Sequence, residues 1–158
     1  MGKKREVPQA LAEQAYRLSK IRLLAQEPFD ADRLGLYAQL WHETLLPCAA
    51  CLYLFDEERK LSGVRVLYSG RKWAARRYCE DLPAIFAESG AAMIGVSMTA
   101  EEPQATGQDI TELSRVALYC ERERIPVLEM ILLDESGYIP LYRAGGEVPP
   151  RYEEKMQK

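Results

Sequence analysis

The stretch LYLFDEERKLSGVRVLYSG, residues 52–70, decides how this chain folds. An apolar run is followed by the charged turn DEERK and then by a second run with strict alternation. In the second run the valines fall on one side of an extended chain, and Arg65 and Leu67 fall on the other. The pattern predicts two strands, 51–55 and 61–68, joined as a hairpin.

Working outward from the hairpin, apolar spacing and proline positions predict four helices and three further strands. The resulting order is α-α-β-β-α-β-α-β-β. It mixes hairpins with helical crossovers, so we expect an α+β domain, a three-layer αβα arrangement whose mixed central sheet is flanked by helices. The expected helices cover 8–26, 30–46, 81–88 and 109–124, and the further strands cover 93–98, 127–133 and 138–143.

Length and charge set broad limits on the function. The chain has 158 residues, which suits one core, and its net charge of −3 gives no general attraction to nucleic acid. No run approaches the roughly 18 apolar residues that span a bilayer, and no apolar segment follows the charged MGKKREVPQ start. We therefore expect a cytoplasmic protein without a membrane partner. The end of the chain, 146–158, is charged and is expected to be mobile.

The four cysteines admit two interpretations. Cys48 and Cys51 form a CxxC, which is typical of zinc or redox sites. However, CAACLYLF reads as the start of a strand, where residues three apart point to opposite faces. Buried thiols are therefore favoured over a metal site, and they are expected to be free in the cytoplasm. The only histidine, His42, lies in a helical stretch without an evident ligand partner.

Four segments, taken in order, resemble the RadC-like JAB/MPN (JAMM) domain. They are the hairpin 52–70, AESGAAMIGVSM at 87–98, EPQATGQDI at 102–110 and LLDESGYIPL at 132–141. The resemblance covers about 30–143 and implies a cytidine-deaminase-like architecture for a domain at 30–145, preceded by an N-terminal helix at 1–29. The residues that carry the resemblance are Asp56, Leu61, Leu67, Tyr68, Gly70, Pro103, Thr106 and Asp109.

Active members of that family carry a Glu, then His-x-His-Pro, then Ser-x-x-Asp. The resemblance implies that two histidines and the Asp bind zinc, which lowers the pKa of a bound water. Here Arg65 stands at the Glu position, Val96 and Met98 at the His positions, Thr106 at the Ser position and Asp109 at the Asp position. Valine has no donor atom and arginine cannot act as a base near neutral pH. We expect no catalytic residues and no cofactor, although active relatives use zinc.

Asp109 and Arg65 each have two interpretations. Thr106 and Asp109 have the spacing of a capping box at a helix start, which we favour over a residual ligand role for Asp109. If the cation is lost, Arg65 could neutralise Asp109, or pair with Glu101 or Glu102. The alternative is an arginine on an exposed strand face.

A basic segment raises the question of nucleic-acid binding. It contains one aromatic ring, and basic residues with a stacking ring can bind single strands. RadC-like proteins have been linked by name with DNA repair. A solvated face is the favoured interpretation, because acidic residues follow at once. The segment comprises Arg71, Lys72, Trp73, Arg76 and Arg77.

Two interpretations are open for the apolar residues Val96, Met98 and Met130. They form either a plain apolar core, which we favour, or an adaptable groove.

Taken together, the residues predict a pseudoenzyme that serves as a protein-interaction or scaffolding module. Its partner would be an unidentified protein or a second copy in a homodimer. The alternatives are a JAB-type zinc metallopeptidase or isopeptidase, with a site assembled differently or shared with another chain, and a nucleic-acid-associated accessory protein.

Overall fold

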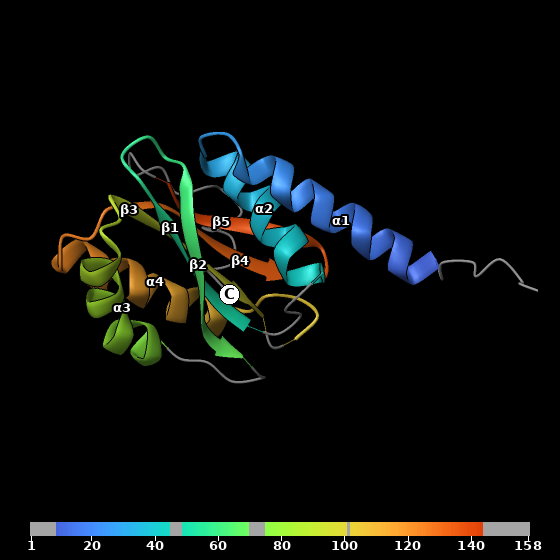
Figure 1. The fold of residues 1–158 in the computed structure, drawn as a ribbon. Coiled ribbons are helices and arrows are strands. Elements are labelled where there is room, and N and C mark those ends of the chain that lie inside the picture. Colours follow the sequence, from blue (N-terminus) through green and yellow to red (C-terminus); the bar gives the residue numbers. More distant parts are fainter. Residues whose placement is uncertain (1–8, 45–48, 70–74, 101, 144–158) are drawn as a thin grey trace, which may run out of the picture.

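The structure is a computed structural model that describes residues 9–44, 49–69, 75–100 and 102–143 (Figure 1). The elements within these ranges follow the predicted order, and the predicted tail at 146–158 lies outside them. None of the described helices has both the length and the apolar character that crossing a bilayer requires. The elements are α1 (Gln9–Ala25), α2 (Ala31–Thr44), β1 (Ala49–Phe55), β2 (Leu61–Ser69), α3 (Ala75–Ser89), β3 (Met93–Thr99), α4 (Gly107–Arg122), β4 (Val127–Asp134) and β5 (Gly137–Arg143).

The five strands form one mixed sheet in the order β2-β1-β3-β4-β5. β1 is antiparallel to both β2 and β3, β4 and β5 form an antiparallel hairpin, and β3 and β4 are parallel. The parallel pair is connected through α4, since parallel neighbours need a crossover. The predicted hairpin of β1 and β2 is therefore confirmed, and it lies at one edge of the sheet, with the β4–β5 hairpin at the other (Figure 1).

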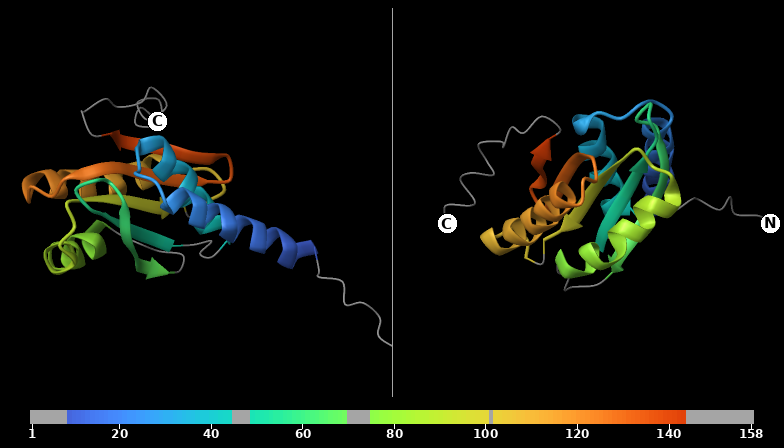
Figure 2. Two further views of the ribbon diagram at one scale, coloured as in Figure 1. Left: turned by 45° about the horizontal axis from the view of Figure 1, so that its top comes forward. Right: turned by 90° about the vertical axis from the view of Figure 1, so that its left-hand side faces the viewer.

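Helices cover both faces of the sheet and enclose two separate cores (Figure 2). The core on the α3–α4 face contains Leu52, Val96 and Met130, and the core on the α1–α2 face contains Tyr53 and Ile131. Every side chain of β1 is buried, because it contributes alternately to both cores. The expected α+β class with helices on both faces of a mixed sheet is confirmed.

α3 differs from the prediction, which began this helix near residue 81 with Pro83 in its first turn. The helix begins at Ala75, so Pro83 lies in its interior. A proline there cannot donate the usual backbone hydrogen bond. Leu82 is nevertheless fully buried, and Ile85 and Phe86 pack against the same core. Burial of this apolar face outweighs the local cost of the proline.

The spacing of Leu11, Ala15, Leu18 and Ile21 predicts one apolar face for α1, and only half of that face is buried. Ile21 is buried and Leu18 packs against the α1–α2 core, as expected. Leu11 and Ala15 are exposed instead. The start of α1 extends past the body of the molecule, so only its second half reaches the core (Figure 1).

Candidate functional site

The strand register places the Glu and first His positions of the expected zinc motif in one row across the sheet. Arg65 lies opposite Leu52, Leu52 opposite Val96, and Val96 opposite Met130. Leu52, Val96 and Met130 are fully buried, as is Met98 two residues further along β3. The interpretation of Val96, Met98 and Met130 as core rather than groove is confirmed.

Arg65 does not neutralise Asp109, so that expectation is wrong. Arg65 is exposed on the edge strand β2, and it forms no ion pair with Asp109 or Glu102, all three of which are described. Glu101 lies outside the described residues. An edge strand lets the guanidinium reach water, where pairing gains little. Asp109 meanwhile has partners of its own at the start of α4.

Thr106 and Asp109 form the predicted capping box. The Asp109 backbone N–H donates to Thr106 Oγ1 at 3.3 Å, and the Thr106 N–H donates to Asp109 Oδ2 at 2.8 Å. The Thr106 hydroxyl also donates to Oδ2 at 3.0 Å. The carboxylate therefore satisfies the backbone N–H of the N-cap residue Thr106, and it lies at the positive end of the helix dipole. These contacts account for an acidic residue at this position without a metal.

Metal-binding side chains do not gather in the part of the chain that the structure describes. Over 9–44, 49–69, 75–100 and 102–143, no three His, Cys, Asp or Glu residues are arranged to hold an ion. Cys51 and Cys120 are buried thiols that form no disulfide with another described cysteine, which agrees with the favoured interpretation of the cysteines. Cys48, the other half of the CxxC, lies outside the described residues.

A buried polar chain beneath α2 was not predicted. His42 Nε2 and Ser97 Oγ are joined by a hydrogen bond of 2.8 Å, and Tyr53 Oη and Ser97 Oγ by one of 2.6 Å. His42 is 2% exposed, and Tyr53 and Ser97 are 0% exposed. Serine and histidine are a common nucleophile and base, but no substrate can reach a fully enclosed serine. The hydrogen bonds among His42, Ser97 and Tyr53 instead satisfy polar groups that are buried between α2 and the sheet.

Burial also makes the groups around this polar chain unreactive. It raises the pKa of the Cys51 thiol to about 11, although the Trp41 and Ser97 side chains partly offset the effect. Burial likewise raises the pKa of Tyr37 to about 12 and that of Tyr53 well above its usual value. These groups are neutral at pH 7, and a protonated thiol is a poor nucleophile and a poor metal ligand.

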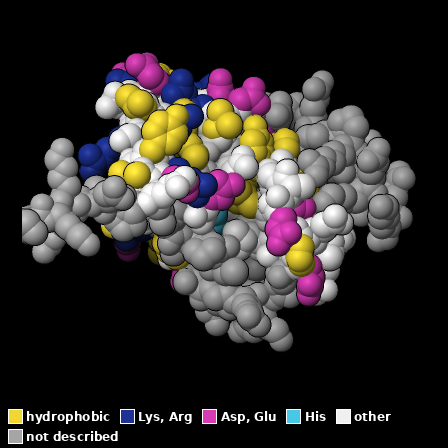
Figure 3. Space-filling model, turned by 90° about the vertical axis from the view of Figure 1, so that its right-hand side faces the viewer, with side chains coloured by type: hydrophobic (Ala, Val, Ile, Leu, Met, Phe, Trp, Pro, Cys, Tyr) yellow, Lys and Arg dark blue, Asp and Glu magenta, His cyan; other side chains and the backbone are white. Residues whose placement is uncertain are grey.

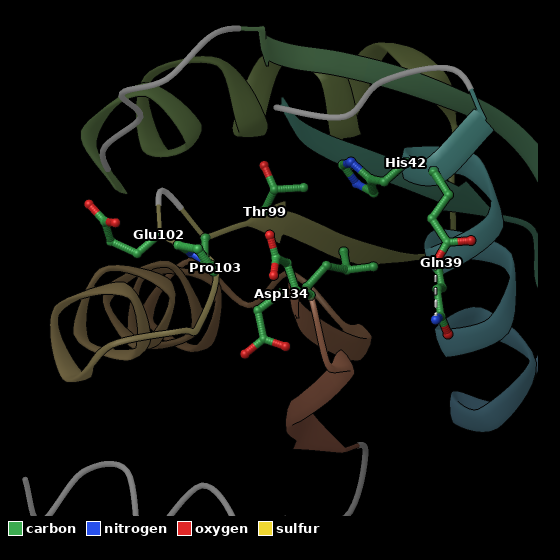
Figure 4. Close-up of a pocket in the computed structure, with 10 residues that line it drawn as sticks. Gln39, His42, Thr99, Glu102, Pro103 and Asp134 are labelled. Carbon is green, nitrogen blue, oxygen red and sulfur yellow. Dashed lines mark hydrogen bonds between the residues drawn. The ribbon is translucent and has the colours of Figure 1, made fainter.

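A cavity of about 360 Å³ opens where the parallel strands β3 and β4 end (Figure 4). Thr99, Asp134 and His42 line it, together with Glu43 of α2 and Glu102 of the loop before α4. Several carboxylates disfavour an anionic ligand here. Asp134 has structural partners, since it accepts hydrogen bonds from the Ala105 N–H and from the N–H and hydroxyl of Ser136.

The basic segment lies largely beyond the described residues. Arg71, Lys72 and Trp73 are outside them, and only the backbone of Arg76 and Arg77 is described, in the first turn of α3. The nucleic-acid interpretation of this segment stays a prediction.

The structure thus brings Arg65, Val96 and Met98 to one face of the sheet and sets Thr106 and Asp109 at the start of α4. It does not join them into a polar centre. In comparisons with known proteins, no protein-family model and no curated protein matches the chain.

Proposed function

We propose that this chain is a RadC-like JAB/MPN domain of cytidine-deaminase-like architecture that performs no zinc chemistry and acts through contacts with other proteins. The mixed sheet between two helical layers and the predicted order of elements support this relationship. So does the strand register, which aligns Arg65 with Val96 across β1.

One observation carries the proposal. Val96 and Met98, at the two His positions, are fully buried among apolar side chains of the α3–α4 core. Valine offers no donor, and a thioether is a poor zinc ligand. Interiors are close-packed, so an ion would have to displace these side chains. The third ligand position, Asp109, is held by the helix cap.

Loss of the metal centre leaves the outer surfaces as the parts that can act. The edge strand β2 has one neighbour in the sheet, and its Val66 side chain is 46% exposed. An edge strand offers unpaired backbone groups to an extended partner segment. The outer face of α1 and α2 offers a second surface, because several of its leucines are exposed.

Metal content tests the proposal. The full chain, purified from zinc-supplemented culture, is expected to carry far less than one zinc per chain by mass spectrometry and to cleave no isopeptide-linked substrate. Stoichiometric zinc that supports cleavage, lost together on chelation, would instead favour the metallopeptidase.

Asp109→Asn provides the matched control. Replacing the carboxylate by an amide removes the charge that favours both zinc binding and the interaction with the helix dipole. The two interpretations of Asp109 then predict different results. Under the proposal, this variant is less stable and its metal content equals that of the parent. A fall in bound zinc in Asp109→Asn would assign the residue to a metal site.

A further inference from the structure

β2 is the longest strand of the described sheet and forms one of its two edges. It runs over 9 residues, Leu61–Ser69, and β1 is its only neighbour among the described strands (Figure 1). In an antiparallel pair, every second residue of an edge strand turns its N–H and C=O groups away from the neighbouring strand. Such a row of backbone groups can pair with a strand from another protein.

The opposite edge of the sheet, β5, is less suited to such pairing. It carries Pro140 at its centre, opposite Ile131 of β4. Proline has no backbone N–H, and in an edge strand the missing donor faces outward. Leu61–Ser69 contains no proline. Of the two edges, β2 is therefore the one whose row of donors is complete.

Two exposed side chains lie near the centre of the β2 edge. Arg65 is exposed and Val66 is 46% exposed, and successive residues of a strand point to opposite faces. Arg65 lies opposite Leu52, on the α3–α4 face, and Val66 lies on the α1–α2 face. The register between β1 and β2 is regular over Gly63–Val66 and shifts on either side of it. An added strand would therefore be centred on Arg65 and Val66.

The charge of this edge favours an acidic partner. Arg65 forms no ion pair with another residue that the structure describes. The charged residues at positions 61–77 are all basic, although the net charge of the whole chain is −3. They are Arg65, Arg71, Lys72, Arg76 and Arg77, of which Arg65 alone has a described side chain. A carboxylate beside Arg65 would meet an unpaired cation, whereas a basic partner would be repelled.

The exposed face of α1 and α2 offers no comparable preference. On the side of the molecule that carries these helices, hydrophobic side chains lie among both basic and acidic ones (Figure 3). Because both signs of charge surround the apolar side chains there, charge does not indicate which partner would bind. The β2 edge differs, since Arg65 is the one charged residue of the strand.

We propose that β2 binds an extended, acidic segment of another protein, which joins the sheet as an added strand. The carboxylates of this segment would lie beside Arg65 on one face. Its apolar side chains would lie beside Val66 on the other face, because alternate residues of a strand point to opposite sides. Hydrogen bonds to the outward-facing backbone groups of Gly63–Val66 would hold the segment in register.

This inference deepens the proposed function, since it names the surface and the chemistry of the protein contact, and it rests on that function in this respect. The two can fail separately, because metal content tests the core of the domain and peptide binding tests the edge of the sheet. A chain that contains zinc and binds the acidic segment would contradict the proposed function alone. A zinc-free chain that binds no acidic segment would contradict this inference alone.

The first test uses a fluorescent, end-blocked peptide of the same length as β2, in which glutamate alternates with valine. Fluorescence anisotropy with the full chain is expected to show binding. Methylation of the peptide's backbone amides removes its donors and should abolish binding, and lysine in place of glutamate should weaken it roughly tenfold. Absence of binding, or equal binding of the methylated peptide, overturns the proposal. So does tighter binding of a single-stranded thymidine oligonucleotide than of the glutamate peptide.

A charge reversal tests the role of Arg65. Arg65→Glu should raise the dissociation constant of the glutamate peptide roughly tenfold and lower that of the lysine peptide by a similar factor. Arg22→Glu is the matched control, because Arg22 is exposed on α1 and its reversal changes the net charge equally. Circular dichroism verifies that both variants fold. Equal weakening in the two variants would reveal a general attraction between charges and would overturn the assignment to β2.

Hydrogen exchange locates the bound peptide. Saturating glutamate peptide should slow the exchange of outward-facing amides in β2 and leave β5 unchanged, because only groups that gain a hydrogen-bond partner are protected. Protection that appears in β5 or in a helix, with none in β2, overturns the proposal.

Discussion

At the scale of single residues, Thr106 supports α4 through its hydroxyl. It accepts the Asp109 N–H, which would otherwise lack a helical partner. Thr106→Ala is expected to lower the free energy of unfolding by about 1 kcal/mol, measured by urea denaturation. Thr106→Ser keeps the hydroxyl and should retain most of the stability. Equal losses in both variants would show that the methyl group, not the cap, is responsible.

Cys51 gives a pH dependence whose sign follows from its environment. Burial raises the pKa of this thiol from 9.0 to about 11. The unfolded thiol therefore ionises first, and deprotonation favours unfolding. The contribution is fully present below pH 9 and is lost as the pH rises from 9 toward 11.

The measurement is the free energy of unfolding between pH 7 and pH 11. Stability should fall above pH 9, and in Cys51→Ala the fall should be shallower. Tyr37 and Cys120 also have raised pKa values, so some decline persists in the variant. An identical pH profile in parent and variant would contradict a buried, protonated Cys51.

Sequence reasoning at this scale succeeded where partners are close in the chain. Thr106 and Asp109 are three residues apart, and their spacing alone predicted the cap. His42 and Ser97 are 55 residues apart, and no local pattern announces their hydrogen bond. The one signal in the sequence was Ser97 itself, which stands inside the apolar run MIGVSM. A hydroxyl in a buried strand needs a hydrogen-bond partner.

At the scale of elements, Gly95 allows α2 to approach β3. A Cβ atom there would lie 2.5 Å from Leu34 Cδ2 and 3.2 Å from Phe55 Cε2. Gly95→Ala is expected to lower the free energy of unfolding by about 1–3 kcal/mol, because the core must shift to admit the methyl group. Chemical denaturation measures the change.

Gly63→Ala is the matched control for Gly95→Ala. Gly63 also lies in a strand, but a Cβ there would sit 3.7 Å from Leu54 Cδ1, an ordinary contact distance. This variant should be much closer to the parent in stability. Equal losses at both positions would point to a general strand effect rather than to close packing against α2.

The elements themselves were largely predictable, because alternation and helical spacing follow from which side chains face a core. α3 was predicted too short, since Asp81 and Pro83 resemble a helix start. The helix instead begins at Ala75 and runs through both residues. The burial of Leu82, which offsets the cost of the proline, is a tertiary contact that local spacing does not show.

At the scale of the whole molecule, the sequence predicted the layers but not what each layer encloses. The side chains of Val96 and Met98 were enough to predict that these positions bind no zinc. Their full enclosure depends on how α3 and α4 cover the sheet. The exposed leucines of α1 and α2 were missed because helical spacing identifies an apolar stripe but not whether anything covers it.

The position of β1 has a consequence for the growing chain. β1 ends at Phe55 and pairs first with β2, but its other neighbour begins only at Met93. All side chains of β1 are buried in the finished fold. During synthesis, one edge of β1 stays unpaired until β3 has been made. Until then the nascent hairpin presents an open apolar edge, so this is the interval in which a chaperone would have most to shield.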